Sequence, residues 1–132
     1  MQAKQTGFTL IELVVVIVIL GILSAVALPR FINLSGEAAQ AAAQGVAGAV
    51  SSATAINYAA RKASASAGVG PILSCANAST NAATLLAGGL PPGYTVTGGA
   101  GCTDGNSDTC TVTNTNVTPN RTASAVIVCV SP

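Results

Sequence analysis

One carboxylate stands inside an apolar segment near the start of this 132-residue chain. Residues 8–28 form a run of 21 residues in which Glu12 is the only charged side chain. About 20 apolar residues in a helix are enough to cross a bilayer. An acid costs about 2.5–3.5 kcal/mol to insert near the centre of such a helix, and less near its end. Glu12 therefore needs a partner that offsets this cost.

A cut between Gly7 and Phe8 would create that partner. The new amine at Phe8 would be a cation four residues before Glu12, which is one helical turn. Pairing within one subunit or between neighbouring subunits would offset the cost of burying the acid. Pairing between subunits would also set the axial register of packed helices, as one buried polar group does in a coiled coil.

The residues around this bond resemble a known processing signal. The segment GFTLIE at residues 7–12, with the short polar leader before it, resembles the prepilin-peptidase motif of type IV pilins and pseudopilins. The apolar run up to Pro29, with Gly21 inside it, is similar to the hydrophobic core helix of that family. Residues 29–34 most resemble its mannose-sensitive haemagglutinin branch. The close resemblance covers residues 1–37.

The resemblance implies a structural role in a filament. A prepilin peptidase would cut after Gly7 and methylate the amine of Phe8, and Glu12 would neutralise that amine during assembly. The expected partners are other copies of the chain, the peptidase, the pilus assembly machinery and the inner membrane before assembly. The expected final location is an extracellular pilus that serves attachment, adhesion or motility.

Two alternatives to a major pilus subunit stay open. A pseudopilin or minor pilin of a type II secretion or DNA-uptake system would share the same amino-terminal signal. A surface or periplasmic binding domain with an uncleaved anchor would instead retain the terminus MQAKQTG and form no polymer.

The resemblance also implies an α+β pilin fold, in which a long amino-terminal helix, kinked near Pro29, packs on a small antiparallel sheet. Residues 1–7 would be the leader, 8–36 the transmembrane and filament-core helix, and 37–132 the globular head. Gly21 and Pro29 both weaken a helix locally, which gives a physical reason for unwinding between them.

The residue pattern after Pro29 predicts the elements of the head. A helix restarting at Ser35 would cover residues 37–62, with an apolar stripe at Val46, Ala49, Val50, Ala53, Ile56 and Ala60. A long loop with a short helical piece at residues 79–87 would follow. Alternating and β-branched residues predict strands at 94–97, 109–113 and 123–130.

Four cysteines supply the remaining chemistry, at positions 75, 102, 110 and 129. An even number of cysteines outside a zinc-type spacing, behind an export signal, indicates two disulfides rather than a zinc site. Three pairings are possible. We favour Cys102–Cys110, which closes a short loop, and Cys75–Cys129, which fastens the long loop to the last strand.

Composition argues against most other functions. The chain has no histidine, so the commonest general base and metal ligand are missing, and no phosphate-binding loop is present. We therefore predict no enzyme, no cofactor and no metal. A formal charge of +1 does not favour nucleic-acid binding. Asp104 to Asp108 resembles the opening of a calcium loop, but no glutamate completes it.

Overall fold

A computed structural model describes residues 7–132, apart from the side chains of residues 31–33. The first six residues of the expected leader lie outside the described part. Contacts divide the chain into two compact units, one that ends at Gly36 and a second, Glu37–Pro132.

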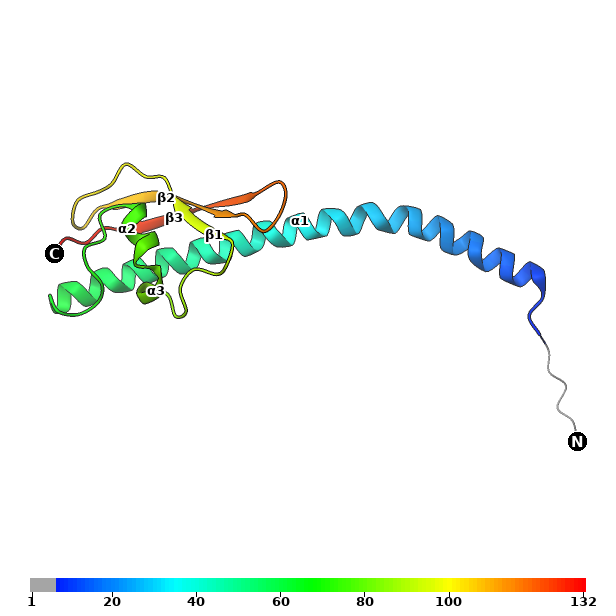
Figure 1. The fold of residues 1–132 in the computed structure, drawn as a ribbon, viewed down its shortest axis with the longest axis horizontal. Coiled ribbons are helices and arrows are strands. Elements are labelled where there is room, and N and C mark those ends of the chain that lie inside the picture. The colour runs from blue at the N-terminus through cyan, green and yellow to red at the C-terminus, as the bar shows by residue number, and fades with distance from the viewer. Residues whose placement is uncertain (1–6) are drawn as a thin grey trace, which may run out of the picture. The chain divides into compact units, whose positions relative to one another are not determined.

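Helix α1 (Leu10–Ala63) extends through both units without a break (Figure 1). The prediction of a second helix that restarts at Ser35 is therefore wrong. Pro29 lies inside α1 and removes a single N–H donor from the helical hydrogen bonds. Alanine and leucine shortly before Pro29, and the alanines after residue 37, favour the helix on the two sides of this position.

The second unit contains a three-stranded antiparallel sheet in the order β1-β2-β3. Its strands are β1 (Tyr94–Thr97), β2 (Ser107–Asn114) and β3 (Arg121–Val128). In the register, Val96 faces Val112 and Cys110 faces Ala125, so these four buried side chains share the inner face of the sheet. The expected α+β pilin fold, a long helix with a small antiparallel sheet, is confirmed.

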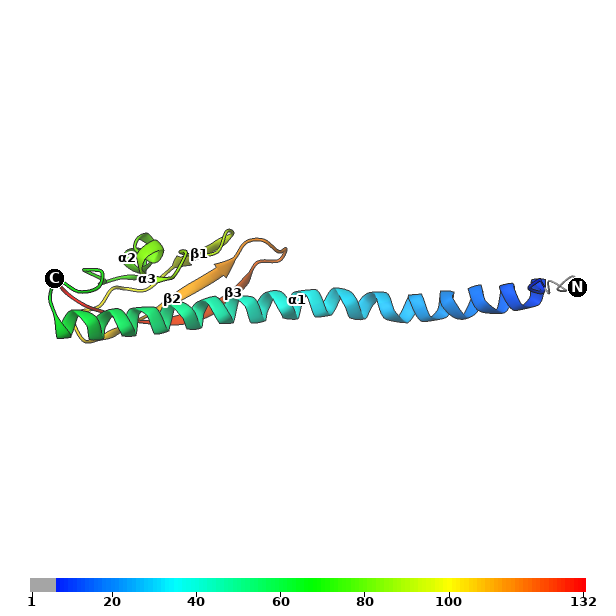
Figure 2. The ribbon, with the colours of Figure 1, turned by 90° about the horizontal axis from the view of Figure 1, so that it is seen from below.

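Residues 37–63 of α1 lie beneath this sheet (Figure 2). Their buried positions recur at intervals of three or four residues and share only Val50 with the predicted stripe: Ala39, Ala43, Ala47, Val50, Thr54 and Asn57. Ile56, which we expected in the stripe, is 70% exposed. The buried face is thus set by small and polar side chains rather than by the largest apolar one.

Polar side chains of α1 bind the outer edge of β3. The Thr122 carbonyl accepts a hydrogen bond from Gln40 Nε2 at 2.7 Å. Further along the strand, the backbone N–H of Val126 donates to Ser51 Oγ at 2.9 Å, and that of Val128 donates to Thr54 Oγ1 at 3.3 Å. An open strand edge is a template for unwanted pairing. Helix α1 therefore closes one of the two edges of the sheet.

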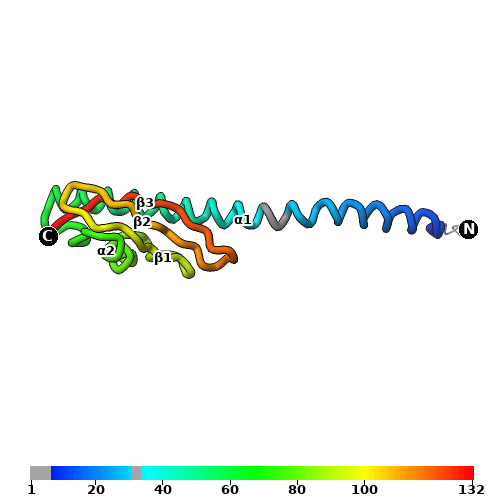
Figure 3. The backbone as a smooth tube through the Cα atoms, turned by 90° about the horizontal axis from the view of Figure 1, so that it is seen from above, coloured from blue at the N-terminus to red at the C-terminus, as the bar shows by residue number. Residues whose placement is uncertain are grey.

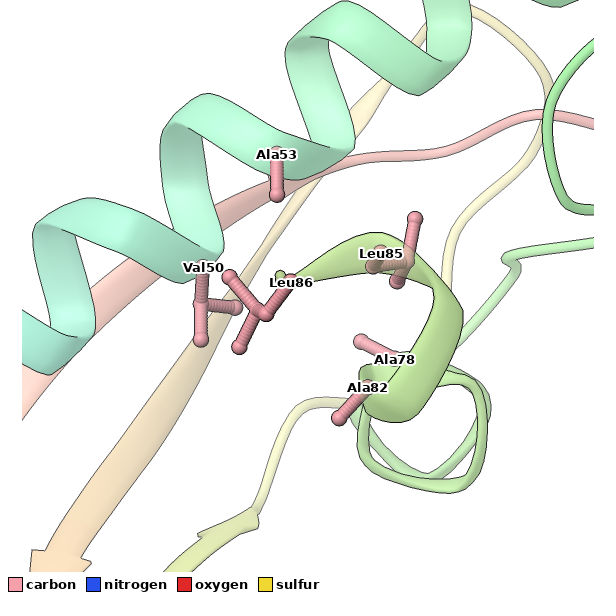
Figure 4. Close-up of a pocket in the computed structure, with 6 residues that line it drawn as sticks. All are labelled: Val50, Ala53, Ala78, Ala82, Leu85 and Leu86. Carbon is pink, nitrogen blue, oxygen red and sulfur yellow. The ribbon is translucent and has the colours of Figure 1, made fainter. Parts of the chain in front are cut away.

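Two short helices, α2 (Cys75–Thr80) and α3 (Ala82–Leu85), occupy the region predicted as a loop with one helical piece. The Ser74 side chain caps α2 by accepting from the N–H of Asn77. Figure 4 shows a small apolar recess where these helices approach α1, lined by Val50, Ala53, Ala78, Ala82, Leu85 and Leu86. Its lining carries no polar group that would orient a ligand.

The disulfides join Cys75 to Cys110 and Cys102 to Cys129, with Cα–Cα distances of 5.6 and 6.0 Å. The pairing that we favoured from the sequence, Cys102–Cys110 with Cys75–Cys129, is therefore wrong. Cys110 points to the inner face of the sheet, where the start of α2 presents Cys75.

The loop between β1 and β2 explains the other disulfide. This loop turns back on the end of β3, because the Gly105 N–H donates to the Cys129 carbonyl at 2.9 Å. The Cys129 N–H in turn donates to the Asn106 carbonyl at 2.8 Å. Together these bonds bring Cys102 to Cys129 rather than to its neighbour in sequence.

Candidate processing and assembly segment

The bond between Gly7 and Phe8 lies in non-helical chain just before α1, which begins at Leu10. The Phe8 side chain is 91% exposed. A Cβ atom added to Gly7 would have no other atom within 4 Å, so the described fold does not require a glycine there. An exposed peptide bond outside a helix is accessible to a protease.

Thr9 and Glu12 close the first turn of α1 together. Glu12 Oε2 accepts a hydrogen bond from the Thr9 N–H at 2.9 Å and another from Thr9 Oγ1 at 2.7 Å. The Glu12 N–H donates to Thr9 Oγ1 at 3.4 Å. This reciprocal arrangement is a capping box, which satisfies two backbone donors that a helix start leaves without partners. We did not predict it, although the S/T-x-x-E spacing that signals it is present in the sequence.

The capping box gives the Glu12 carboxylate hydrogen-bond donors other than the expected Phe8 amine. We expected Phe8 and Glu12 to share one face of a helix, but Phe8 precedes the helix and Thr9 is the residue that meets the carboxylate. In the uncut chain the acid therefore already has two donors. An amine created at Phe8 would be added to this arrangement one residue before Thr9.

The surface of α1 in the first unit is apolar and uncovered. Side chains from Leu10 to Leu28 are 39–80% exposed where they are large and hydrophobic. The helix meets the length and hydropathy expected of a membrane span, and none of its most apolar window is buried. Its one hydroxyl in the apolar stretch beyond Glu12, Ser24 Oγ, donates to the Leu20 carbonyl at 2.7 Å. Such a surface requires lipid or other apolar helices around it.

A comparison with protein families identifies this segment. Residues 2–28 match the family model described as the prokaryotic N-terminal methylation motif. The amino-terminal segment of the chain carries this methylation motif. The resemblance to the mannose-sensitive haemagglutinin branch stays a prediction.

A curated pilin is similar over a longer stretch. The chain is 59% identical over 56 residues to the type IV narrow pilus major component PilA5 of Thermus thermophilus. The matched stretch is 42% of this chain and 47% of the relative, so the chain spans about half the length of the curated protein. No solved structure matches the chain.

No contact within the described single chain requires a glycine at position 21 or a proline at position 29. A Cβ atom at Gly21 would meet nothing within 4 Å. Pro29 lies inside α1 without ending it. Their expected role in weakening the helix during assembly remains a prediction.

Two of the three acidic residues of the head, Asp104 and Asp108, are engaged in internal contacts. Asp104 forms an ion pair with Lys62, and its second oxygen accepts from the Ser131 N–H at 3.1 Å. The Lys62 ammonium and the Ser131 N–H both lower the pKa of the Asp104 carboxyl, and Asp104 raises the pKa of Lys62. Asp108 accepts from the Gly101 and Thr109 N–H groups, each at 2.9 Å. Among the described residues, no group of three acidic or cysteine side chains converges as metal ligands would.

Proposed function

We propose that this chain is a structural subunit of a type IV pilus. In this proposal a prepilin peptidase cuts between Gly7 and Phe8 and methylates the new amine. The subunit then leaves the inner membrane and polymerises through its amino-terminal helix into an extracellular filament for attachment or motility. The observation that carries the proposal is the methylation motif at residues 2–28, together with the most apolar part of α1, none of which is buried.

The energetics of the transfer support this use of the helix. In the bilayer the exposed side chains of residues 10–28 contact lipid, and in a filament they would contact the same side chains of other subunits. Both environments are apolar, so the hydrophobic effect neither drives nor strongly opposes the move. The free energy of this transfer then depends mainly on helix packing and on the few polar groups, of which Glu12 is the charged one.

Glu12 has a specific task in this mechanism. Its carboxylate lies at the start of α1, where the Thr9 donors hold it. The methylated amine of Phe8 would remain a cation, so an acid at this position can attract the amine of its own or a neighbouring subunit. An ion pair between subunits would stabilise one axial register of the helices relative to the others.

The test compares Glu12→Ala with Glu37→Ala, an exposed acid of the second unit. We expect Glu12→Ala to remain in the membrane, cut at Gly7, and to yield few or no sheared filaments. The Glu37→Ala chain should yield filaments like the unaltered chain. Normal filaments from Glu12→Ala would contradict the mechanism. Processed chain that never becomes abundant in sheared surface material, even unaltered, would identify a pseudopilin or minor pilin instead.

A further inference from the structure

The two disulfides of the head are interleaved along the chain. The first cysteine is joined to the third, Cys75 to Cys110, and the second to the fourth, Cys102 to Cys129. The partners are 35 and 27 residues apart. Cys102 and Cys110 are only eight residues apart and belong to different disulfides. A bond between these two neighbours therefore prevents both native bonds at once.

An unfolded chain favours this wrong bond. The entropy cost of closing a flexible loop rises with the logarithm of the loop length. On this basis closure between Cys102 and Cys110 is about six times more probable than closure between Cys102 and Cys129. It is about nine times more probable than closure between Cys75 and Cys110. The residues between Cys102 and Cys110 are small or polar and include Gly105 but no proline, so this short loop can bend.

The native pairing becomes favourable only once the head has folded. The Cys102 N–H donates to the Leu73 carbonyl at 2.9 Å, and Ile72 and Val130 exchange two backbone hydrogen bonds of the same length. These bonds join segments that are far apart in the sequence. Figure 3 shows that the loop between β1 and β2 turns at the same end of the head as the carboxy terminus, toward which β3 runs. Folding therefore brings Cys102 to Cys129, away from its near neighbour in the sequence.

The Cys75–Cys110 bond is protected once it has formed. Both residues are fully buried in the core of the head. The Asp108 carboxylate lies 3.8 Å from Cys75 Sγ, and its negative charge opposes the approach of a thiolate. Because thiol–disulfide exchange requires a thiolate to reach one of the sulfurs, the closed head resists it. A wrong bond must therefore be replaced before the head closes.

We propose that the head reaches its native disulfides through thiol–disulfide exchange, in which a Cys102–Cys110 bond forms first and is then replaced. In the exchange the Cys75 thiolate attacks Cys110 Sγ, the Cys102–Cys110 bond breaks, and Cys102 leaves as a thiolate. This step involves no net oxidation. Cys102 and Cys129 are then oxidised by the disulfide of a thioredoxin-like oxidase, which takes up two electrons and two protons and becomes a dithiol.

A partner is needed when all four cysteines have been oxidised. A chain that holds Cys102–Cys110 and Cys75–Cys129 has no thiolate of its own. An external thiolate then attacks Cys110 Sγ and frees Cys102, and the Cys102 thiolate attacks Cys129 Sγ and frees Cys75. Finally the Cys75 thiolate attacks Cys110 Sγ and releases the external thiolate unchanged. The interleaved pairing thus assigns to this chain a partner of the dithiol isomerase class, a role beyond the proposed function.

The first test measures the wrong bond in the unfolded chain. The full chain, reduced and denatured in guanidinium chloride with detergent, is oxidised briefly with limiting diamide and blocked with N-ethylmaleimide. Peptide mapping without reduction then counts each bond. We expect Cys102–Cys110 to be about six times as abundant as Cys102–Cys129 and about nine times as abundant as Cys75–Cys110. Native bonds as abundant as Cys102–Cys110 would overturn the inference.

The second test follows the replacement of the wrong bond. The denatured chain is oxidised completely with diamide and is then transferred to native conditions with or without reduced glutathione. We expect the native pairs to be recovered with glutathione, whereas Cys102–Cys110 should persist without it. Equal recovery without a thiol, or no recovery with one, would contradict the exchange.

Two double variants are the matched controls. Cys102→Ser with Cys129→Ser retains only the Cys75–Cys110 pair, and Cys75→Ser with Cys110→Ser retains only the Cys102–Cys129 pair. Neither variant can form the wrong bond, so each should close its native bond at the same rate with and without glutathione. A thiol requirement in these variants would show that glutathione acts elsewhere and would refute the inference. None of these measurements needs a filament, so their outcome is independent of the proposed function.

Discussion

The Thr9 hydroxyl and the Glu12 carboxylate are hydrogen-bonded at 2.7 Å, across the first turn of the helix that we propose as the filament core. The same carboxylate also accepts from the Thr9 backbone N–H. One acid therefore serves two purposes, since it completes the helix start and is available to the amine that processing would create. Two substitutions separate these purposes.

Thr9→Val keeps the branched shape of the side chain but removes the hydroxyl, so we expect the start of α1 to fray. Loss of a capping side chain costs about 0.5–2 kcal/mol. Amide hydrogen exchange of the full chain in micelles should then speed up at residues 11–13. Glu12→Gln retains an oxygen acceptor and should leave this exchange nearly unchanged, while assembly fails for lack of charge. Equal exchange rates in Thr9→Val and the unaltered chain would refute the capping role.

Gly7→Val should block processing although it does not disturb the fold. A Cβ atom at Gly7 would meet no other atom of the described structure within 4 Å, so the described fold gives no reason for a loss of processing. Gly21→Ala is the matched control, since its added methyl group is also unopposed in the single chain. Mass spectrometry of membrane fractions should find an uncut terminus for Gly7→Val and a terminus at Phe8 for Gly21→Ala. A Phe8 terminus in the valine variant would show that the cut does not depend on Gly7.

Peptide mapping without reduction should recover the disulfides Cys75–Cys110 and Cys102–Cys129. Combined digestion with trypsin, chymotrypsin and an aspartate-directed protease would separate all four cysteines, because cuts at Tyr94, Asp108 and Arg121 lie between them. The fragment that contains Cys102 should be linked to residues 122–132. A link from Cys102 to the fragment with Cys110 would restore the pairing that the sequence suggested.

The Lys62–Asp104 pair should make the head slightly sensitive to acid. The lowered pKa of Asp104 means that its stabilising effect is present above the ordinary aspartate pKa of about 3.9 and is lost as pH falls through the lowered value. The raised pKa of Lys62 acts in the opposite sense, with a loss as pH rises through that value.

Thermal unfolding of the full chain in detergent measures this dependence. Asp104→Asn should lower the midpoint slightly at neutral pH and should flatten its fall between about pH 5 and pH 2. The effect should be small and should shrink with added salt, because both side chains are exposed to solvent. Glu37→Gln, at an exposed acid of α1, is the control. If the midpoint falls equally with decreasing pH in the Asp104→Asn and unaltered chains, the Lys62–Asp104 pair is not the cause of that fall.

Local patterns in the sequence predicted much of this molecule. The apolar run, the lone acid at Glu12 and the alternation in β1 to β3 each depend on neighbours in the chain, and the corresponding elements are present. The capping box was equally local, and its spacing could have been recognised. The helix restart expected at Ser35 was wrong, because α1 continues past Pro29 into the alanine-rich sequence after residue 37.

Contacts between distant residues could not be predicted in the same way. Thr54 and Asn57 occupy the buried stripe because their polar atoms bind the backbone of Val128 and Val69. Hydrophobicity alone favoured Ile56, which is exposed. The pairing of Cys102 with Cys129 likewise depends on a loop that folds back through its own backbone hydrogen bonds.

Mass spectrometry of the amino terminus of sheared surface filaments tests the central claim most directly. We predict a filament whose subunit begins at Phe8 with a methylated amine and lacks residues 1–7. Surface material in which this chain still begins with Met1, and which contains no filament, would contradict the claim.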